Sequence, residues 1–162
     1  MERTSARGKK GEFWVLMAPD WVNVVPVVTT PSGEPGFLMV RQYRHGADAI
    51  TTEFPAGLIE PGEDPAGAAA RELEEETGWR AGRLTPLNTV APNPAFMNNR
   101  SFTFLAEDLV KTGEIRPDEL ESLEPRIVAA SEIERSLGTG EYVNALTVLG
   151  YLWYRHRGVP PR

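Results

Sequence analysis

The pattern of apolar residues in this 162-residue chain predicts one domain of the α/β or α+β class, in which helices and a sheet form a sandwich. Two observations predict this class. Short β-branched or alternating runs recur along the chain, and segments with helical periodicity lie between and after them. No repeat or long linker interrupts the pattern. We therefore expect a single domain over residues 13–156, with flexible tails at 1–12 and 157–162.

Strands are expected where apolar residues run together or alternate. Residues 22–28 are a β-branched run typical of a buried strand, and turn signals in 31–35 join it to a second strand at 37–43. Residues 101–106 alternate in the manner of a half-buried strand. Further elements are expected as strands at 13–17, 51–54, 84–90 and 126–130, and as a proline- and asparagine-rich loop at 91–99.

The helix expected at residues 65–77 has the clearest boundaries. Asp64 can cap its first turn, Pro65 suits the first helical position, and Gly78 suits the exit from the last turn. A spacing of about 100° per residue defines one side that should face the core. That side contains Ala66, Ala69, Ala70, Leu73 and Thr77, and the small Ala68 lies on the neighbouring side.

Two further helices are expected near the end of the chain. Ser131 opens a short one, because Glu134 three residues later completes a capping box. Residues 141–155 form the last helix and carry one apolar stripe. The stripe consists of Tyr142, Leu146, Leu149 and Trp153.

Composition excludes several functional classes. The formal net charge of −6 disfavours non-specific binding to the negatively charged backbone of a nucleic acid. The absence of cysteine excludes disulfides, thiolate metal sites and a cysteine nucleophile. No apolar run approaches the length of a membrane span, and the first residues lack the apolar segment of a signal peptide. We therefore expect a cytoplasmic protein with neither a nucleic acid nor a membrane as partner.

Three glutamates, Glu72, Glu75 and Glu76, fall together on the helix beside its expected core face. Their repulsion costs about 0.2–0.5 kcal/mol per pair on an exposed helix, and a divalent cation removes that cost. Carboxylate oxygens suit the hard cation Mg²⁺, which keeps waters that a substrate phosphate can share. The alternative is a solvated acidic face on which Arg71, one turn away, pairs with Glu75.

The residues around these glutamates resemble the Nudix box. Five residues separate Gly57 from Glu63, and seven more lead to the run from Arg71 to Trp79, Arg-Glu-Leu-Glu-Glu-Glu-Thr-Gly-Trp. Every fixed position of the pattern is matched, although Trp79 is a less usual choice at the last, bulky position. The resemblance implies the family's α/β/α sandwich with a mixed central sheet. It also implies metal-dependent hydrolysis of a nucleoside diphosphate derivative, with Mg²⁺ or alternatively Mn²⁺ as cofactor.

The resemblance further implies a role for each residue of the box. Arg71 would orient the carboxylates, Gly57 would let its loop pass close to the metal, and Glu63 would support that loop or bind metal through water. The bound metal would neutralise the diphosphate and lower the pKa of a bound water. The implied metal ligands are Glu72, Glu75 and Glu76, with the carbonyl of Ala56 as a further one.

The flanks of the box are similar to the ADP-ribose and NDP-sugar pyrophosphatase branch of the family. Arg41-Gln-Tyr-Arg44, the run from Glu53 to Gly57, and Pro94 carry this similarity. It implies cleavage of an NDP-sugar to a nucleoside monophosphate and a sugar phosphate. The alternatives are a hydrolase of dinucleoside polyphosphates or nucleoside triphosphates, and a non-catalytic nucleotide-binding domain. The expected substrate-binding residues are Arg41, Arg44, Glu53, Phe96, Asn98, Asn99 and Arg100.

Some of these residues have simpler interpretations. Arg41 and Arg44 could serve only in surface ion pairs, and Phe96 could anchor its loop in the core. Where they do bind substrate, the arginines match phosphate oxygens through their forked guanidinium groups.

A general base is expected in the acidic run at residues 118–124, which resembles an acidic loop of the same branch. Glu121 aligns best with the strand that follows, while Glu119 and Glu124 are alternatives. The remaining interpretation is that the loop is only solvated and water is activated at the box itself.

A homodimer is implied by the same resemblance, since enzymes of this branch often draw active-site residues from two subunits. Phe13, Trp14 and Trp21 are the expected interface residues. Ordinary core packing is the alternative for all three aromatic side chains.

Overall fold

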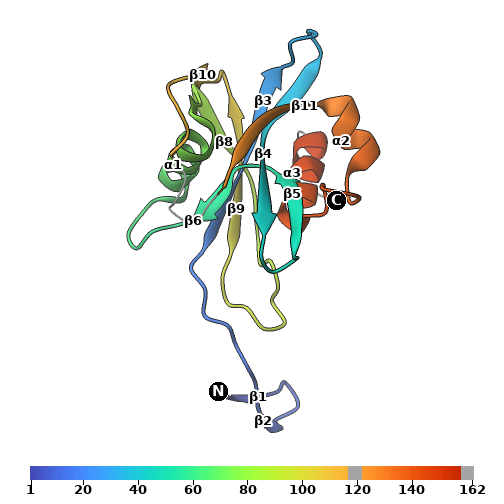
Figure 1. The fold of residues 1–162 in the computed structure, drawn as a ribbon. Helices are drawn as coiled ribbons and strands as arrows, with labels where there is room; N and C mark the ends of the chain where they lie inside the picture. Colours follow the sequence, from blue (N-terminus) through green and yellow to red (C-terminus); the bar gives the residue numbers. More distant parts are fainter. Residues whose placement is uncertain (117–121, 158–162) are drawn as a thin grey trace.

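The computed structural model describes residues 1–116 and 122–157, and a mixed sheet forms its centre (Figure 1). The strands of this sheet are β3 (Trp21–Thr29), β4 (Pro35–Arg44), β5 (Ala49–Glu53), β6 (Ala56–Leu58), β8 (Arg83–Val90), β9 (Ser101–Glu107) and β11 (Glu124–Ala129). They are arranged in the order β11-β4-β3-β9-β8, with β5 paired to β4 and β6 paired to β3. The pair β3–β9 is parallel and the other pairs are antiparallel.

Helices cover both faces of the sheet. Figure 1 shows α1 (Pro65–Thr77) on one side, and α2 (Ala130–Ser136) and α3 (Ala145–His156) on the other. Side chains of β3 alternate between the two layers, so that Val24 packs with Leu73 of α1, whereas Val25 packs with Tyr151 of α3. The predicted sandwich with a mixed sheet is confirmed. No helix within the two described ranges combines the length and apolar character that a bilayer span requires.

The strands β3 and β4 diverge toward one end of the sheet. Residues 27–29 of β3 pair with β4, but residues 21–23 pair with β6 instead. The far half of β4 pairs with β5. The chain crosses this opening between β5 and β6, where the carbonyl of Pro55 accepts a hydrogen bond from the N–H of Val24 at 2.8 Å. This opening positions the candidate site.

Helix α1 begins and ends where the sequence predicts. Asp64 accepts a hydrogen bond from the N–H of Gly67 at 3.0 Å, and Gly78, with φ of 72°, ends the helix in the left-handed region. Its buried face is rotated from the predicted one, because Ala68 and Glu76 are buried while Ala66 and Ala70 are only half-buried. The rotation places the carboxylate of Glu76 against the sheet.

The last helix differs from the prediction in start and orientation. It begins at Ala145 rather than at 141, because the side chain of Asn144 caps its first turn. The buried face consists of Thr147, Gly150 and Tyr151, not the predicted apolar stripe. Gly150 permits this close approach, since a β-carbon there would lie 2.7 Å from Nδ2 of Asn23 in β3.

Two other predictions are wrong. Residues 13–17 form no strand beyond a single bridge from Leu16 to Met97. The capping box at Ser131 is absent, because α2 starts at Ala130 and Glu134 instead accepts a hydrogen bond from Tyr151.

Five short strands of the described residues lie outside the predicted set, and one of them, β6, belongs to the central sheet. At the N-terminus β1 (Glu2–Thr4) and β2 (Lys10–Glu12) form an antiparallel hairpin that lies apart from the sheet (Figure 1). After α1, β7 (Trp79–Arg80) pairs with β10 (Val110–Lys111). The division into tails and one domain stays a prediction.

Candidate active site

The glutamate cluster consists of Glu72, Glu75 and Glu76 on α1, and Arg71 of the same helix contacts two of them. Its Nε and Nη2 donate to the two carboxylate oxygens of Glu63 at 2.9 and 3.0 Å, and Nη2 also donates to the carbonyl of Leu58 at 2.9 Å. Its Nη1 donates to Glu72 at 2.8 Å and to Glu75 at 3.2 Å. The planar guanidinium therefore fixes the loop before α1 relative to two glutamates on α1.

These hydrogen bonds also shift the pKa values of Arg71 and Glu63. Bonding to Glu63 is the main cause that raises the pKa of Arg71, and the same bond lowers the pKa of Glu63. Both groups therefore stay ionised over the physiological pH range. The predicted pairing of Arg71 with Glu75 is present, but it is one contact in a larger network.

The backbone of β6 lies directly against the remaining glutamates. The N–H of Ala56 donates to Oε2 of Glu76 at 3.0 Å, and Glu76 is 4% exposed. A β-carbon added at Gly57 would lie 2.1 Å from the carboxylate of Glu72. Only glycine allows the chain to pass there with Glu72 in this position, which is the physical reason for Gly57.

The carboxylate oxygens of the cluster suit a hard divalent cation, and the carbonyl of Ala56 stays a predicted further ligand. Among the described residues, no three acidic or histidine side chains already converge at metal-ligand spacing. Arg71 occupies the same carboxylates, since it binds both Glu72 and Glu75. A cation at this position would compete with one guanidinium nitrogen and would leave the bonds from Arg71 to Glu63 intact.

A pocket of about 380 Å³ opens beside the glutamate cluster, where β3 and β4 diverge. Ala56 and Gly57 line this pocket and also contact Glu76 and Glu72. The backbone of Ala56 and Gly57 therefore adjoins both the pocket and the cluster. Its volume lies within the range of about 300–1,000 Å³ that is usual for small-ligand sites. The lining residues are Trp21, Val22, Arg44, Ala56, Gly57, Leu58, Asn144 and Leu146.

Arg44 brings a positive charge to the wall of this pocket. Its Nε donates to Oε1 of Glu53 at 3.0 Å and its Nη2 donates to Oε2 at 2.8 Å. Glu53 is 1% exposed. Burial alone would raise the pKa of Glu53, but hydrogen bonds from Arg44 and Thr51 outweigh it and the pKa is lowered. The ionised Glu53 thus holds the guanidinium plane of Arg44 at the pocket.

Arg41 lies on the opposite face of β4, because its position differs from that of Arg44 by three, an odd number, and side chains alternate along a strand. It binds Glu141 through Nε at 3.0 Å and Glu124 through Nη1 at 3.5 Å. The ion-pair interpretation therefore describes Arg41 in this structure, whereas Arg44 and Glu53 lie together at the pocket.

The expected substrate residues of the 91–100 loop contact the segment that leads into β3. Phe96 is 48% exposed, and its carbonyl accepts a hydrogen bond from Leu16, so its side chain is not a core anchor. These contacts hold residues 18–20, which lead into β3 at Trp21. A direct role of the loop in substrate binding stays a prediction. The side-chain contacts are Asn98 with Ala18, Asn99 with Pro19, and Arg100 with Asp20, each at 3.0 Å.

The acidic run expected to supply the base is only partly described. Glu119 and Glu121 lie outside the described residues. Glu124 is described, and its exposed side chain pairs with Arg41. Before the run, the N–H of Arg116 donates to the carbonyl of Glu75 at 2.7 Å. The chain therefore contacts the glutamate helix immediately before the acidic run begins.

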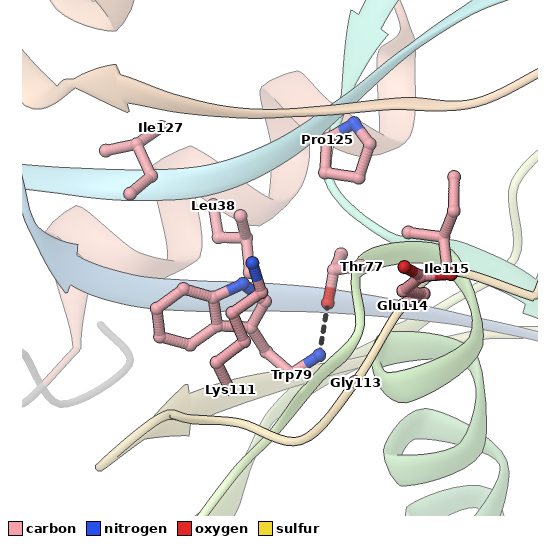
Figure 2. A pocket seen from close by; sticks show the side chains of 9 residues that line it. All are labelled: Leu38, Thr77, Trp79, Lys111, Gly113, Glu114, Ile115, Pro125 and Ile127. Atoms are coloured by element: carbon pink, nitrogen blue, oxygen red, sulfur yellow. Dashed lines mark hydrogen bonds between the residues drawn. The ribbon is translucent and has the colours of Figure 1, made fainter.

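A larger pocket, about 610 Å³, lies at the C-terminal end of α1 (Figure 2). Trp79 lines it together with Leu38 and Ile127, and its N–H donates to Oγ1 of Thr77 at 3.2 Å. The tryptophan fills space between the end of α1 and the sheet, which explains a bulky residue at this position. The cluster glutamates are not among the described lining residues of either pocket, but Ala56 and Gly57 line the smaller one and contact Glu76 and Glu72, so the smaller pocket is the candidate active site.

Several residues of the smaller pocket carry no sequence pattern that predicts a site. Trp21, one of the expected interface residues, is half-buried and lines the pocket, and its place in an interface stays a prediction. Leu58, Asn144 and Leu146 were not expected at a site. Asn144 and Leu146 come from the start of α3, and no local pattern links that segment to β4 or β6.

Comparisons with known proteins place similar sequences and a similar fold beside this chain. Residues 20–146 match the family model described as the NUDIX domain. The chain is 35% identical over 141 residues to an ADP-ribose pyrophosphatase of Bacillus subtilis, a match that covers 86% of this chain and 74% of that protein. It is 34% identical over 104 residues to the ADP compounds hydrolase of Escherichia coli, covering 64% of this chain and 50% of that protein. A solved structure described as an ADP compounds hydrolase superposes with a TM-score of 0.81 at 25% identity, over 96% of this chain and 82% of that one.

Proposed function

This chain belongs to the Nudix family, and from that premise we propose that it hydrolyses the diphosphate of an NDP-sugar such as ADP-ribose. The products are a nucleoside monophosphate and a sugar phosphate. One observation carries the proposal: the backbone of Ala56 and Gly57 is shared by the glutamate cluster and by a pocket that contains Arg44. A diphosphate held across β6 would meet the carboxylates on one side and a guanidinium on the other. The names of the relatives, ADP-ribose pyrophosphatase and ADP compounds hydrolase, support this substrate class.

The residues act as follows in this proposal. Glu72, Glu75 and Glu76 hold a divalent cation, Mg²⁺ or alternatively Mn²⁺. When bound, the cation neutralises the diphosphate and lowers the pKa of a bound water. Arg71 orients the carboxylates, and its bonds to Glu63 and to the carbonyl of Leu58 hold the arginine itself in place.

Binding of the substrate falls to the pocket. The forked guanidinium of Arg44 matches phosphate oxygens, and its bonds to Glu53 fix its orientation before the substrate arrives. The apolar side chains of Trp21 and Leu58 give a base or sugar a surface to pack against. Proton removal from the attacking water is assigned to Glu121, with Glu119 and Glu124 as alternatives.

A homodimer is a further part of the proposal, supported by apolar side chains on the N-terminal segment. Trp14 is 95% exposed and Met17 is 67% exposed, and Phe13 is half-exposed beside them. Such a group of exposed apolar residues is unusual on a monomer and is typical of an interface. Trp14→Ser should shift the mass measured by light scattering from dimer to monomer, and a wild-type monomer would contradict this part. A cytoplasmic location also stays a prediction.

A substrate panel tests the proposed function. ADP-ribose, other NDP-sugars, dinucleoside polyphosphates and nucleoside triphosphates are each incubated with Mg²⁺, and the products are identified by chromatography. We expect turnover of one or more NDP-sugars and weak turnover of triphosphates. Preferential cleavage of triphosphates or dinucleoside polyphosphates would support the alternative hydrolase. Binding without any turnover would support a non-catalytic domain.

A further inference from the structure

The connection from β5 to β6 crosses the opening where β3 and β4 diverge, and both layers of helices bind its backbone. The N–H of Phe54 donates to Oγ1 of Thr147 in α3 at 3.2 Å. Two residues later, the N–H of Ala56 donates to Oε2 of Glu76 in α1 at 3.0 Å. Pro55, between them, has no N–H. Side chains from helices on opposite sides of the sheet therefore bind successive N–H groups of this crossing (Figure 1).

Thr147 is itself fixed in the first turn of α3. Its side chain belongs to the buried face of the helix, and its N–H donates to the capping side chain of Asn144 at 3.1 Å. The same turn is bound to β3, because Nδ2 of Asn23 donates to the carbonyl of Leu146 at 3.1 Å. The hydroxyl of Thr147 is therefore presented to the crossing from a rigid position.

Removing the hydroxyl of Thr147 would leave a buried N–H without its partner. Phe54 is 1% exposed, and an unpaired buried donor is costly. A shift of the backbone at Phe54 would relieve this cost, and Ala56 would move with it because it lies only two residues further along. Glu76 accepts its hydrogen bond from Ala56 and is itself 4% exposed. Loss of the hydroxyl should therefore displace the carboxylate of Glu76.

We infer that Thr147 is a positioning residue, which holds the backbone of Phe54 so that the N–H of Ala56 orients the carboxylate of Glu76. The role of Glu76 as a metal ligand rests on the proposed function. The link from Thr147 to Glu76 does not, because it consists of hydrogen bonds within the chain. Groups that orient a metal ligand typically change the metal affinity about 10–100-fold when they are removed.

Three variants separate positioning from a general loss of stability. Thr147→Val keeps the shape but removes the hydroxyl, and Thr147→Ser keeps the hydroxyl. Tyr151→Phe is the matched control on α3, because it removes a hydrogen bond of 2.9 Å to Glu134 instead. Thr147→Val and Tyr151→Phe should each lower the melting temperature by about 2–4 °C.

Binding of Mn²⁺ alone, measured by electron paramagnetic resonance, distinguishes these variants. Thr147→Val should raise the dissociation constant about tenfold, whereas Thr147→Ser and Tyr151→Phe should stay within about twofold of the wild type. Equal weakening by Thr147→Ser or by Tyr151→Phe would overturn the inference, because the hydroxyl would then not be the cause.

A second measurement depends neither on metal nor on turnover. The amide proton of Ala56, bonded to a buried carboxylate, should exchange slowly with water in ¹H–¹⁵N spectra of the metal-free protein. Thr147→Val should speed this exchange about tenfold, as expected when a hydrogen bond to a charged group is weakened, and Tyr151→Phe should change it less than about twofold. Unchanged exchange in Thr147→Val would overturn the inference, because the disturbance would then end at Phe54. If Glu76→Gln binds Mn²⁺ as tightly as the wild type, the metal role in the proposed function fails, and the exchange of Ala56 still decides the role of Thr147.

Discussion

Gly57 and Glu72 are in contact across the boundary between the pocket and the glutamate cluster. A β-carbon on Gly57 would lie 2.1 Å from both Cδ and Oε1 of Glu72. The obstructed atoms are the far end of a flexible side chain, and Gly57 is not among the glycines with positive φ. The backbone therefore tolerates alanine at 57, but the added methyl group displaces the carboxylate of Glu72.

Gly57→Ala should consequently fold but lose activity. We expect a melting temperature within about 3 °C of the wild type and a kcat lowered by about 10²-fold, the usual effect of displacing a catalytic group by about 1 Å. Gly46→Ala is the matched control, because a β-carbon there meets nothing within 4 Å. Full activity of Gly57→Ala would show that Glu72 does not need its position beside β6.

Glutamine at the cluster positions should abolish most of the activity. Glu72→Gln and Glu76→Gln keep side-chain shape but remove a charged ligand, and we expect kcat to fall by at least about 10²-fold. Folding should survive, because the change relieves repulsion on α1. Glu74→Gln is the control on the same helix, since Glu74 faces Arg80 and Thr112. Near-full activity of both cluster variants would show that Glu72 and Glu76 are not needed as metal ligands.

Glu53 should contribute to acid sensitivity. Its pKa is lowered from the ordinary value of 4.5, so its ionised form stabilises the folded protein fully above pH 4.5, and this contribution is lost as pH falls through the lowered value. Chemical unfolding at several pH values measures this. Glu53→Gln should lose less free energy of unfolding below pH 4.5 than the wild type does. Equal slopes for both proteins would show that Glu53 is not stabilised as an anion.

The general base is tested by single-turnover hydrolysis with Gln variants at 119, 121 and 124. Glu121→Gln should slow the reaction by about 10²–10⁴-fold, the usual contribution of general base catalysis. Metal affinity should change less than in Glu76→Gln. A slow variant only at 119 or 124 would move the base to that residue. Three fast variants would leave activation of water to the cluster itself.

The glutamate helix could be predicted closely from sequence because its signals are local. Asp64, Pro65 and Gly78 define its ends within single turns, and the spacing of the glutamates places them together. The rotation that buries Glu76 could not be predicted, because it depends on where β6 crosses the helix. Helical periodicity alone places Ala66 on the core side and Ala68 beside it, and it carries no information about the strand that packs there.

The rest of the pocket depends on contacts between distant parts of the chain. Asn144 lines the pocket because α3 packs close to β3, and that approach needs the missing side chain of Gly150. Likewise, Trp21 lines the pocket because β3 pairs with β6 rather than with β4 at this end. Neither residue carries a local pattern that distinguishes a site from ordinary packing, so only the folded arrangement reveals them.

The central claim is that this site cleaves the diphosphate of an NDP-sugar, and ³¹P spectroscopy of products formed in ¹⁸O-labelled water tests it most directly. With ADP-ribose and Mg²⁺, the wild type should yield AMP and a ribose phosphate, with one ¹⁸O atom incorporated at a single phosphorus. Glu76→Gln and wild type with a chelator should form neither product at a measurable rate. The account would be contradicted if ADP-ribose and other NDP-sugars stayed intact under conditions in which a nucleoside triphosphate was cleaved.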